Sequence, residues 1–187
     1  MNITPSGTAA GLLAIVVGGL LAASPSPQSG DTFVANATIG QHRANPEVVQ
    51  VTVVVDRYTT EAENASLRTA VKQGTTALRA LFNTMPDLGS ITVSGHRTAL
   101  KYAYKPPKNG GQTIVMLTAE PIAALTTAAN PPKAGFDLAL VSLDFSTPGF
   151  AVGEVDPAVK VTTNSDGLIV TESHGAAFVR LSDVEKK

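Results

Sequence analysis

The stretch FDLALVSLDFSTPGFAVGEVD, residues 136–156, decides the fold class of this chain. Two apolar runs flank Thr147, Pro148 and Gly149, which are residues typical of a tight turn, so the runs are expected to pair as an antiparallel hairpin. The run before the turn is apolar on both of its faces, and this indicates a central strand that is covered on each side. The stretch therefore predicts a sheet with antiparallel neighbours.

This hairpin also carries carboxylates. With the turn at its centre, residue numbers that face each other add up to about 296. Asp144 is then expected to face Val152, and Glu154 to face Ser142, which makes the two acids diagonal neighbours on one face. Such a pair can share a cation or divide into an acid and a base. The alternative, which the sequence favours, is that the acids only solvate the hairpin, because no calcium-loop spacing and no histidine lie beside them.

The remaining chain adds helices and further strands. Residues 48–58, VVQVTVVVDRY, alternate valine with polar residues and indicate a strand. Thr60 and Glu63 have the spacing of a capping box, so a helix is expected to start there, and Gly74 should kink it or divide it. After Pro86, short strands separated by turn residues continue to the end.

These elements predict an α+β fold. We expect a meandering, largely antiparallel curled sheet of about 7–8 strands, because short turns join antiparallel neighbours. One kinked helix or two short helices are expected to pack on one face of this sheet.

The first part of the chain predicts export. Residues 9–23, AAGLLAIVVGGLLAA, are uncharged and apolar, and a run of this length fits a signal peptide better than a membrane span. We expect a signal peptide over residues 1–23, with an uncleaved anchor as the alternative. Residues 24–45 are expected to form a flexible arm rich in Ser, Pro and Gly, and residues 46–187 a single α+β domain. The predicted localisation is secreted or periplasmic, with no stable membrane span after cleavage.

Composition excludes several classes of function. Only 16% of the residues are charged and the formal net charge is −1, so no basic surface for nucleic acid is expected. The chain has no cysteine and therefore no disulfide. His42, His96 and His174 lack metal-ligand spacing, and Ser94 near His96 lacks an orienting acid. No catalytic, metal or cofactor site is predicted; enzymatic activity is left open, and a non-catalytic protein is favoured.

One apolar face is the candidate ligand site. On residues 99–105, ALKYAYK, the alternation places Leu100, Tyr102 and Tyr104 on the same face of a strand. A curled sheet with helices across it can enclose a small apolar ligand against such a face. The alternative, which we favour, is an ordinary filled core.

Several segments carry a family resemblance. They are RYTTEAENASLRTAV, GGQTIVMLTAEPI, FDLALVSLDF with VGEVDPAVKVT, and LIVTESHGAAFVRLSDVEKK. Over residues 47–187 the chain resembles an uncharacterised family of small exported proteins typical of acidobacterial-type soil bacteria. The resemblance implies export and an α+β fold, and it implies no activity, cofactor or partner. Relatives often carry Arg where Glu120 stands here, so a basic role at that position does not carry over.

Two functions follow as hypotheses. The first is an exported, non-catalytic domain that acts as a protein-interaction or envelope-associated module. The second is a carrier or sensor of a small apolar ligand held between the sheet and the helices, with Leu100, Tyr102 and Tyr104 as its contacts.

Overall fold

The computed structural model describes residues 29–39, 46–105, 113–126, 132–147, 150–164, 169–174 and 178–187. Within them the elements follow in the order β1 (Ser29–Ile39), β2 (Glu47–Arg57), α1 (Glu61–Gln73), α2 (Thr75–Thr84), β3 (Gly89–Val93), β4 (His96–Tyr104), β5 (Thr113–Thr118), the 3₁₀ turn η1 (Ala123–Leu125), β6 (Leu138–Thr147), β7 (Phe150–Thr163), β8 (Ile169–Ser173) and β9 (Val179–Lys186).

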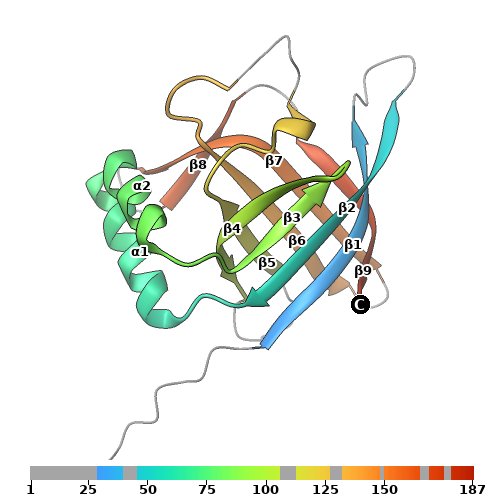
Figure 1. Ribbon diagram of the computed structural model, residues 1–187, viewed down its shortest axis with the longest axis horizontal. Helices are drawn as coiled ribbons and strands as arrows, with labels where there is room; N and C mark the ends of the chain where they lie inside the picture. Colours follow the sequence, from blue (N-terminus) through green and yellow to red (C-terminus); the bar gives the residue numbers. More distant parts are fainter. Residues whose placement is uncertain are drawn as a thin grey trace, which may run out of the picture.

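The strands form one antiparallel sheet that closes on itself. Its order is β6-β5-β4-β3-β2-β1-β9-β7-β8, and an additional pairing of β6 with β7 completes the ring. The predicted α+β class is therefore confirmed, but the sheet is a closed β-barrel and not the curled open sheet that we expected (Figure 1). Closure follows from β1, which pairs with β2 on one side and with β9 on the other.

Strand β1 corrects the expected arm. The sequence predicts a flexible arm over residues 24–45, but Ser29–Ile39 form an 11-residue strand within the barrel. Its side chains at Phe33, Ala35 and Ala37 point inward and are at most 4% exposed. Closing the barrel removes two open sheet edges. Small side chains such as Ala35 and Ala37 fit in the crowded interior that closure creates.

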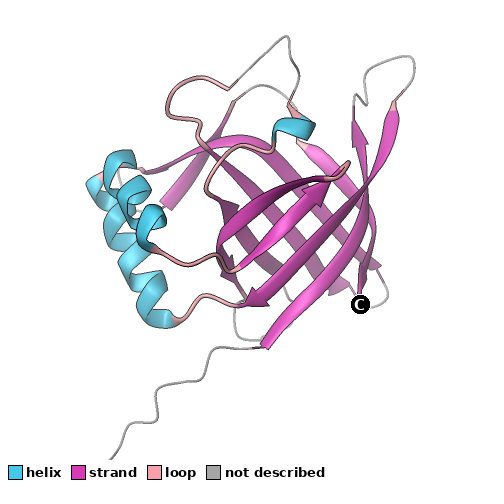
Figure 2. Ribbon diagram, viewed as in Figure 1, coloured by secondary structure: helices cyan, strands magenta, loops and turns pink. Residues whose placement is uncertain are grey.

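The two helices confirm the predicted break. The backbone N–H of Glu63 donates to Oγ1 of Thr60, and the N–H of Thr60 donates to Oε2 of Glu63, so the capping box is complete. Gly74 ends α1 and precedes α2, with a φ of 104° that favours glycine. The pair lies outside the barrel wall (Figure 2).

Apolar side chains form two separate cores. The first fills the barrel interior, and the second lies between the helices and the outer wall. Strand β6 contributes to both, because Val141 and Leu143 point inward while Leu138 and Leu140 face the helices. The prediction of a central strand covered on each side is thus confirmed for residues 138–141, whereas Ser142 and Asp144, further along the outer face, line an open groove.

Strand β7 differs from the expected pattern. The sequence predicts short strands separated by turns, but residues on both sides of Asp156 form one strand of 14 residues, which pairs with β9 in its first half and with β8 in its second half. The register of β7 against β6 shifts between Leu138 and Leu140, next to Asp156. A strand bends at such an irregularity, and this one lies where the second neighbour of β7 changes from β9 to β8.

Candidate functional site

The hairpin has the predicted register. Ser142 lies opposite Glu154, and Asp144 lies opposite Val152. Asp144 and Glu154 are therefore diagonal neighbours, at a Cα separation of about 7–8 Å for such pairs. They face outward, because Leu143, between Ser142 and Asp144 on β6, points into the barrel core.

Both carboxylates line a groove in the outer wall. The groove encloses about 620 Å³ and runs across four strands. Its lining residues are Thr113 from β5, Ser142 and Asp144 from β6, Ala151, Val152, Gly153 and Glu154 from β7, and Arg180, Leu181, Ser182 and Asp183 from β9. Val152 is 39% exposed and is one of four large apolar side chains that are exposed among the described residues. We call this feature the β7–β9 groove.

Strand β9 brings charges that the hairpin alone lacks. Arg180 lies directly opposite Glu154, and both side chains are exposed. Among the ion pairs of the described residues, none joins these two side chains. Asp183 has a φ of 52°, and its Oδ2 accepts hydrogen bonds from Nδ2 of Asn36 at 3.1 Å and from Oγ of Ser182 at 3.2 Å. Its carboxylate is thereby held in place beside the groove.

Gly153 forms part of the floor of the groove. A Cβ at this position would lie 2.7 Å from Cδ2 of Leu143, 3.0 Å from the carbonyl oxygen of Ser142 and 3.1 Å from Cδ1 of Leu181. Glycine therefore allows β7 to lie close to these atoms. The side chains of Leu143 and Leu181, which belong to the barrel core, fill the space beneath Gly153.

The predicted ligand face is divided between the two cores. Strand β4 has a bulge. Leu100 lies opposite Thr118, and Tyr102 lies opposite Leu117, so a step of two residues on β4 matches a step of one residue on β5. Leu100 consequently belongs to the barrel interior, whereas Tyr102 and Tyr104 pack under the helices. The alternation in the sequence placed all three on one face, because it contains no sign of the extra residue.

Tyr102 has its own partners. Its hydroxyl donates a hydrogen bond to Oδ1 of Asn64 on α1 at 3.2 Å, and its ring stacks on Tyr104 with centroids 6.2 Å apart. Burial, together with the charge on neighbouring groups, raises the pKa of Tyr102 to about 12. The two tyrosines thus join helix to barrel wall.

A polar network around Asp31, at one end of the barrel, was not predicted from the sequence. Asp31 on β1 accepts from the hydroxyl of Tyr58 at 2.7 Å, from Nζ of Lys105 at 3.2 Å and from Nζ of Lys186 at 2.6 Å. Burial acts to raise the pKa of Asp31, but these three partners outweigh it and hold the pKa below its ordinary value. The network joins both ends of the chain's folded part. Asp31 is two residues from Phe33, so on a strand both side chains lie on the same face. This spacing could have indicated a buried Asp31 only if residues 29–39 had been predicted to form a strand.

A second buried carboxylate lies at the irregularity in β7. Asp156 is 5% exposed, and it accepts hydrogen bonds from Oγ of Ser173 on β8 and from the backbone N–H of Ala158. Burial is the main influence and raises the pKa of Asp156, although both hydrogen bonds oppose it. The hydrogen bond between Ser173 and Asp156 joins β8 to β7.

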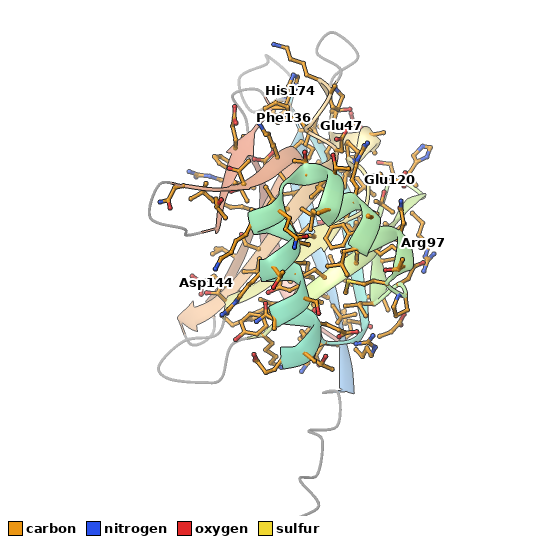
Figure 3. The ribbon with its side chains drawn as sticks, turned by 90° about the vertical axis from the view of Figure 1, so that its left-hand side faces the viewer. Glu47, Arg97, Glu120, Phe136, Asp144 and His174 are labelled. Carbon is orange, nitrogen blue, oxygen red and sulfur yellow. The ribbon has the colours of Figure 1, made fainter. Side chains whose placement is uncertain are left out.

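The other candidates do not converge. Ser94 lies exposed in the turn between β3 and β4, and His96 lies exposed at the start of β4. The ring of His174 packs on Phe136, and His42 lies outside the described residues. Figure 3 shows His174 and Phe136 apart from Asp144. Within the described ranges, no three His, Asp or Glu side chains are grouped so that they could hold a metal ion.

The fold and groove together define a class: a closed antiparallel β-barrel with a helical hairpin on its outer wall and an open, charged groove elsewhere on that wall. Comparison with family models, with curated proteins and with solved structures finds no match for this chain. Among the described residues, none of the helices has the length and apolar character that a membrane crossing needs.

Proposed function

We propose that this protein is an exported, non-catalytic interaction module, and that it contacts a protein partner through the β7–β9 groove. The groove itself carries the proposal. It encloses about 620 Å³ and crosses four strands of the outer wall, so it can receive part of a partner's surface. Exposed charges around the apolar Val152 resemble the polar rim and apolar centre of protein interfaces.

The carboxyl groups with shifted pKa values are consistent with a non-catalytic protein, because contacts within the fold explain their shifts. Such groups often mark active sites, but ion pairs that serve the fold shift pKa values as well. Asp31 joins β1 to β9 through Lys186, Glu63 joins α1 to β2 through Arg57, and Asp156 joins β7 to β8 through Ser173. Their shifts are therefore accounted for by the fold.

The carrier hypothesis has less support. Leu100 is buried in the barrel core, and the space around Tyr102 and Tyr104 holds side chains of the helices and of β5, β6 and β7. No observation on this side favours an enclosed ligand over a filled core.

Site-directed photo-crosslinking in the producing cells tests the proposal. A photoreactive residue replaces Val152 in the groove or, as the control, Ser66 on the exposed side of α1. We expect a discrete protein adduct from position 152 that is absent from position 66 and is lost when Ser182→Trp fills the groove. Adducts that form equally at both positions, or persist with Ser182→Trp, would reject the groove as the interface.

Export is tested separately, since residues 1–28 lie outside the described residues. Intact-mass measurement on protein from the periplasm or medium should give the mass of residues 24–187. A full-length mass in the cytoplasmic fraction alone would contradict export.

A further inference from the structure

The charges of the β7–β9 groove are unbalanced. Of the lining residues that the structure describes, three carry carboxylates, Asp144, Glu154 and Asp183, and one, Arg180, carries a guanidinium. The whole chain has a formal net charge of only −1, so negative charge is concentrated here relative to the rest of the protein. A ligand of positive charge would complement this groove.

Two of the carboxylates are placed to meet such a ligand. Glu154 is exposed and forms no ion pair with the opposing Arg180 among the described residues. Asp183 is oriented by Asn36 and Ser182, which both donate to the same oxygen, Oδ2. A carboxylate already held in one orientation loses less freedom when it binds a cation.

The shape of the groove favours a peptide over a small amine. It crosses strands β5, β6, β7 and β9, and it offers the exposed apolar surface of Val152 next to the carboxylates. Lysine and arginine have an apolar stem and a charged end, so they can cover Val152 while their charge reaches Glu154 or Asp183. A small diamine would leave this apolar surface uncovered.

Resting on the proposed function, we propose that the partner presents an extended, basic segment to the groove, with lysine or arginine side chains at Glu154 and Asp183. Arg180 opposes this binding electrostatically and so limits its strength. Because the charges are exposed, the interaction is screened by salt.

Fluorescence anisotropy with labelled peptides tests the proposal. Three peptides of equal length alternate serine with lysine, glutamate or glutamine, and they are titrated with the purified protein. We expect only the lysine peptide to bind, more weakly as salt rises from about 0.05 M to about 0.3 M and the screening length falls from about 14 Å to about 6 Å. Equal binding of all three, or binding of none, would overturn the proposal.

Variants locate the binding. Each of Glu154→Gln and Asp183→Asn should weaken the lysine peptide about two- to five-fold, and Arg180→Gln should strengthen it by about two-fold or more. Glu47→Gln and Glu172→Gln, made separately, are the matched controls, since each removes one negative charge from an exposed site that does not line the groove. A weaker complex with Arg180→Gln, or an equal loss in the controls, would refute the assignment.

Two further results separate this inference from the proposed function. Competition by free spermidine at concentrations similar to the lysine peptide would overturn the peptide assignment in favour of a small amine. A groove-specific adduct at position 152 without lysine-peptide binding would refute the basic partner and leave the interaction function standing.

Discussion

The hydroxyl of Tyr102 on β4 donates a hydrogen bond to Oδ1 of Asn64 on α1, at 3.2 Å and in a buried position. This contact joins the outer wall of the barrel to the helical hairpin. It is also the polar centre of the apolar layer that holds the helices on the barrel.

Tyr102→Phe should therefore destabilise the protein by about 1–2 kcal/mol, because the buried Oδ1 of Asn64 loses its donor. Urea unfolding measures the loss as a lower midpoint with an unchanged slope. Tyr104→Phe is the control, since Tyr104 is only half-buried. Equal losses in the two variants would contradict the role of this hydrogen bond.

Glu63 should make stability depend on pH. Both of its oxygens accept hydrogen bonds from Arg57, and this bidentate pair, more than the cap at Thr60, lowers the pKa of Glu63 from 4.5 to about 2. The folded state thus holds the proton less tightly than the unfolded chain. The stabilisation is complete above pH 4.5 and is lost as the pH falls from there to about 2.

Glu63→Gln should accordingly cost about 1–2 kcal/mol at neutral pH, and less between those two pH values. Unfolding at several pH values measures the difference, with Glu61→Gln, in the same helical turn but exposed, as the control. A difference that does not change with pH would show that the ion pair is not its source.

Asp156→Asn should stabilise the protein at neutral pH. Burial raises the pKa of Asp156, so the fold favours its neutral form. Asparagine can still accept from the backbone N–H of Ala158 through its amide oxygen, while its amide N–H donates to the hydroxyl oxygen of Ser173. In the wild type, stability should rise as the pH falls through the raised pKa of Asp156 and level off below its unfolded value of 3.8. The variant should lack this rise. Thermal unfolding compares the two proteins, and a less stable variant at neutral pH would contradict the prediction.

Gly153→Ala should destabilise by about 1–3 kcal/mol, because the added Cβ would lie within 3.1 Å of Leu143, Ser142 and Leu181. Leu143→Val in the same protein should restore part of the loss by making room. An unaffected unfolding midpoint in Gly153→Ala would mean that β7 does not cross these side chains so closely.

Gly30→Ala tests whether β1 belongs to the barrel. The added Cβ would lie 1.9 Å from the carbonyl oxygen of Val55, a backbone atom that β2 holds in place. We expect a larger loss of stability than for Gly153→Ala, with no rescue by trimming a side chain. Wild-type stability of this variant would show that β1 contributes nothing, as a flexible arm would.

Local patterns explain what could be predicted. Thr147, Pro148 and Gly149 in the sequence predict a register that matches the pairing of Ser142 with Glu154 and of Asp144 with Val152, so the positions of Asp144 and Glu154 were predictable. Thr60 and Glu63 specify the start of α1 through contacts three residues apart.

Two errors arose where local patterns are weak or misleading. Strand β1 places Ala35 and Ala37 inward, and alanine gives little hydrophobic contrast with the polar residues around it. At β4 one extra residue turns Tyr102 away from the face of Leu100. Nothing in the alternation of residues 99–105 reveals such a bulge.

The candidate site could be predicted only in part. The hairpin supplied Asp144 and Glu154, but Arg180 and Asp183 reach the groove because β9 pairs with both β1 and β7. That pairing joins segments far apart in the chain, and no short-range signal encodes it.

The sequence by itself therefore determined the α+β class, the divided helix and the β6–β7 hairpin, because each depends on residues close together in the chain. Only the tertiary structure decided that the sheet closes through β1, that Tyr102 faces the helices and that Arg180 opposes Glu154. Each of these depends on how distant strands pair, and their pairing is selected by the packing of the whole barrel rather than by any one segment.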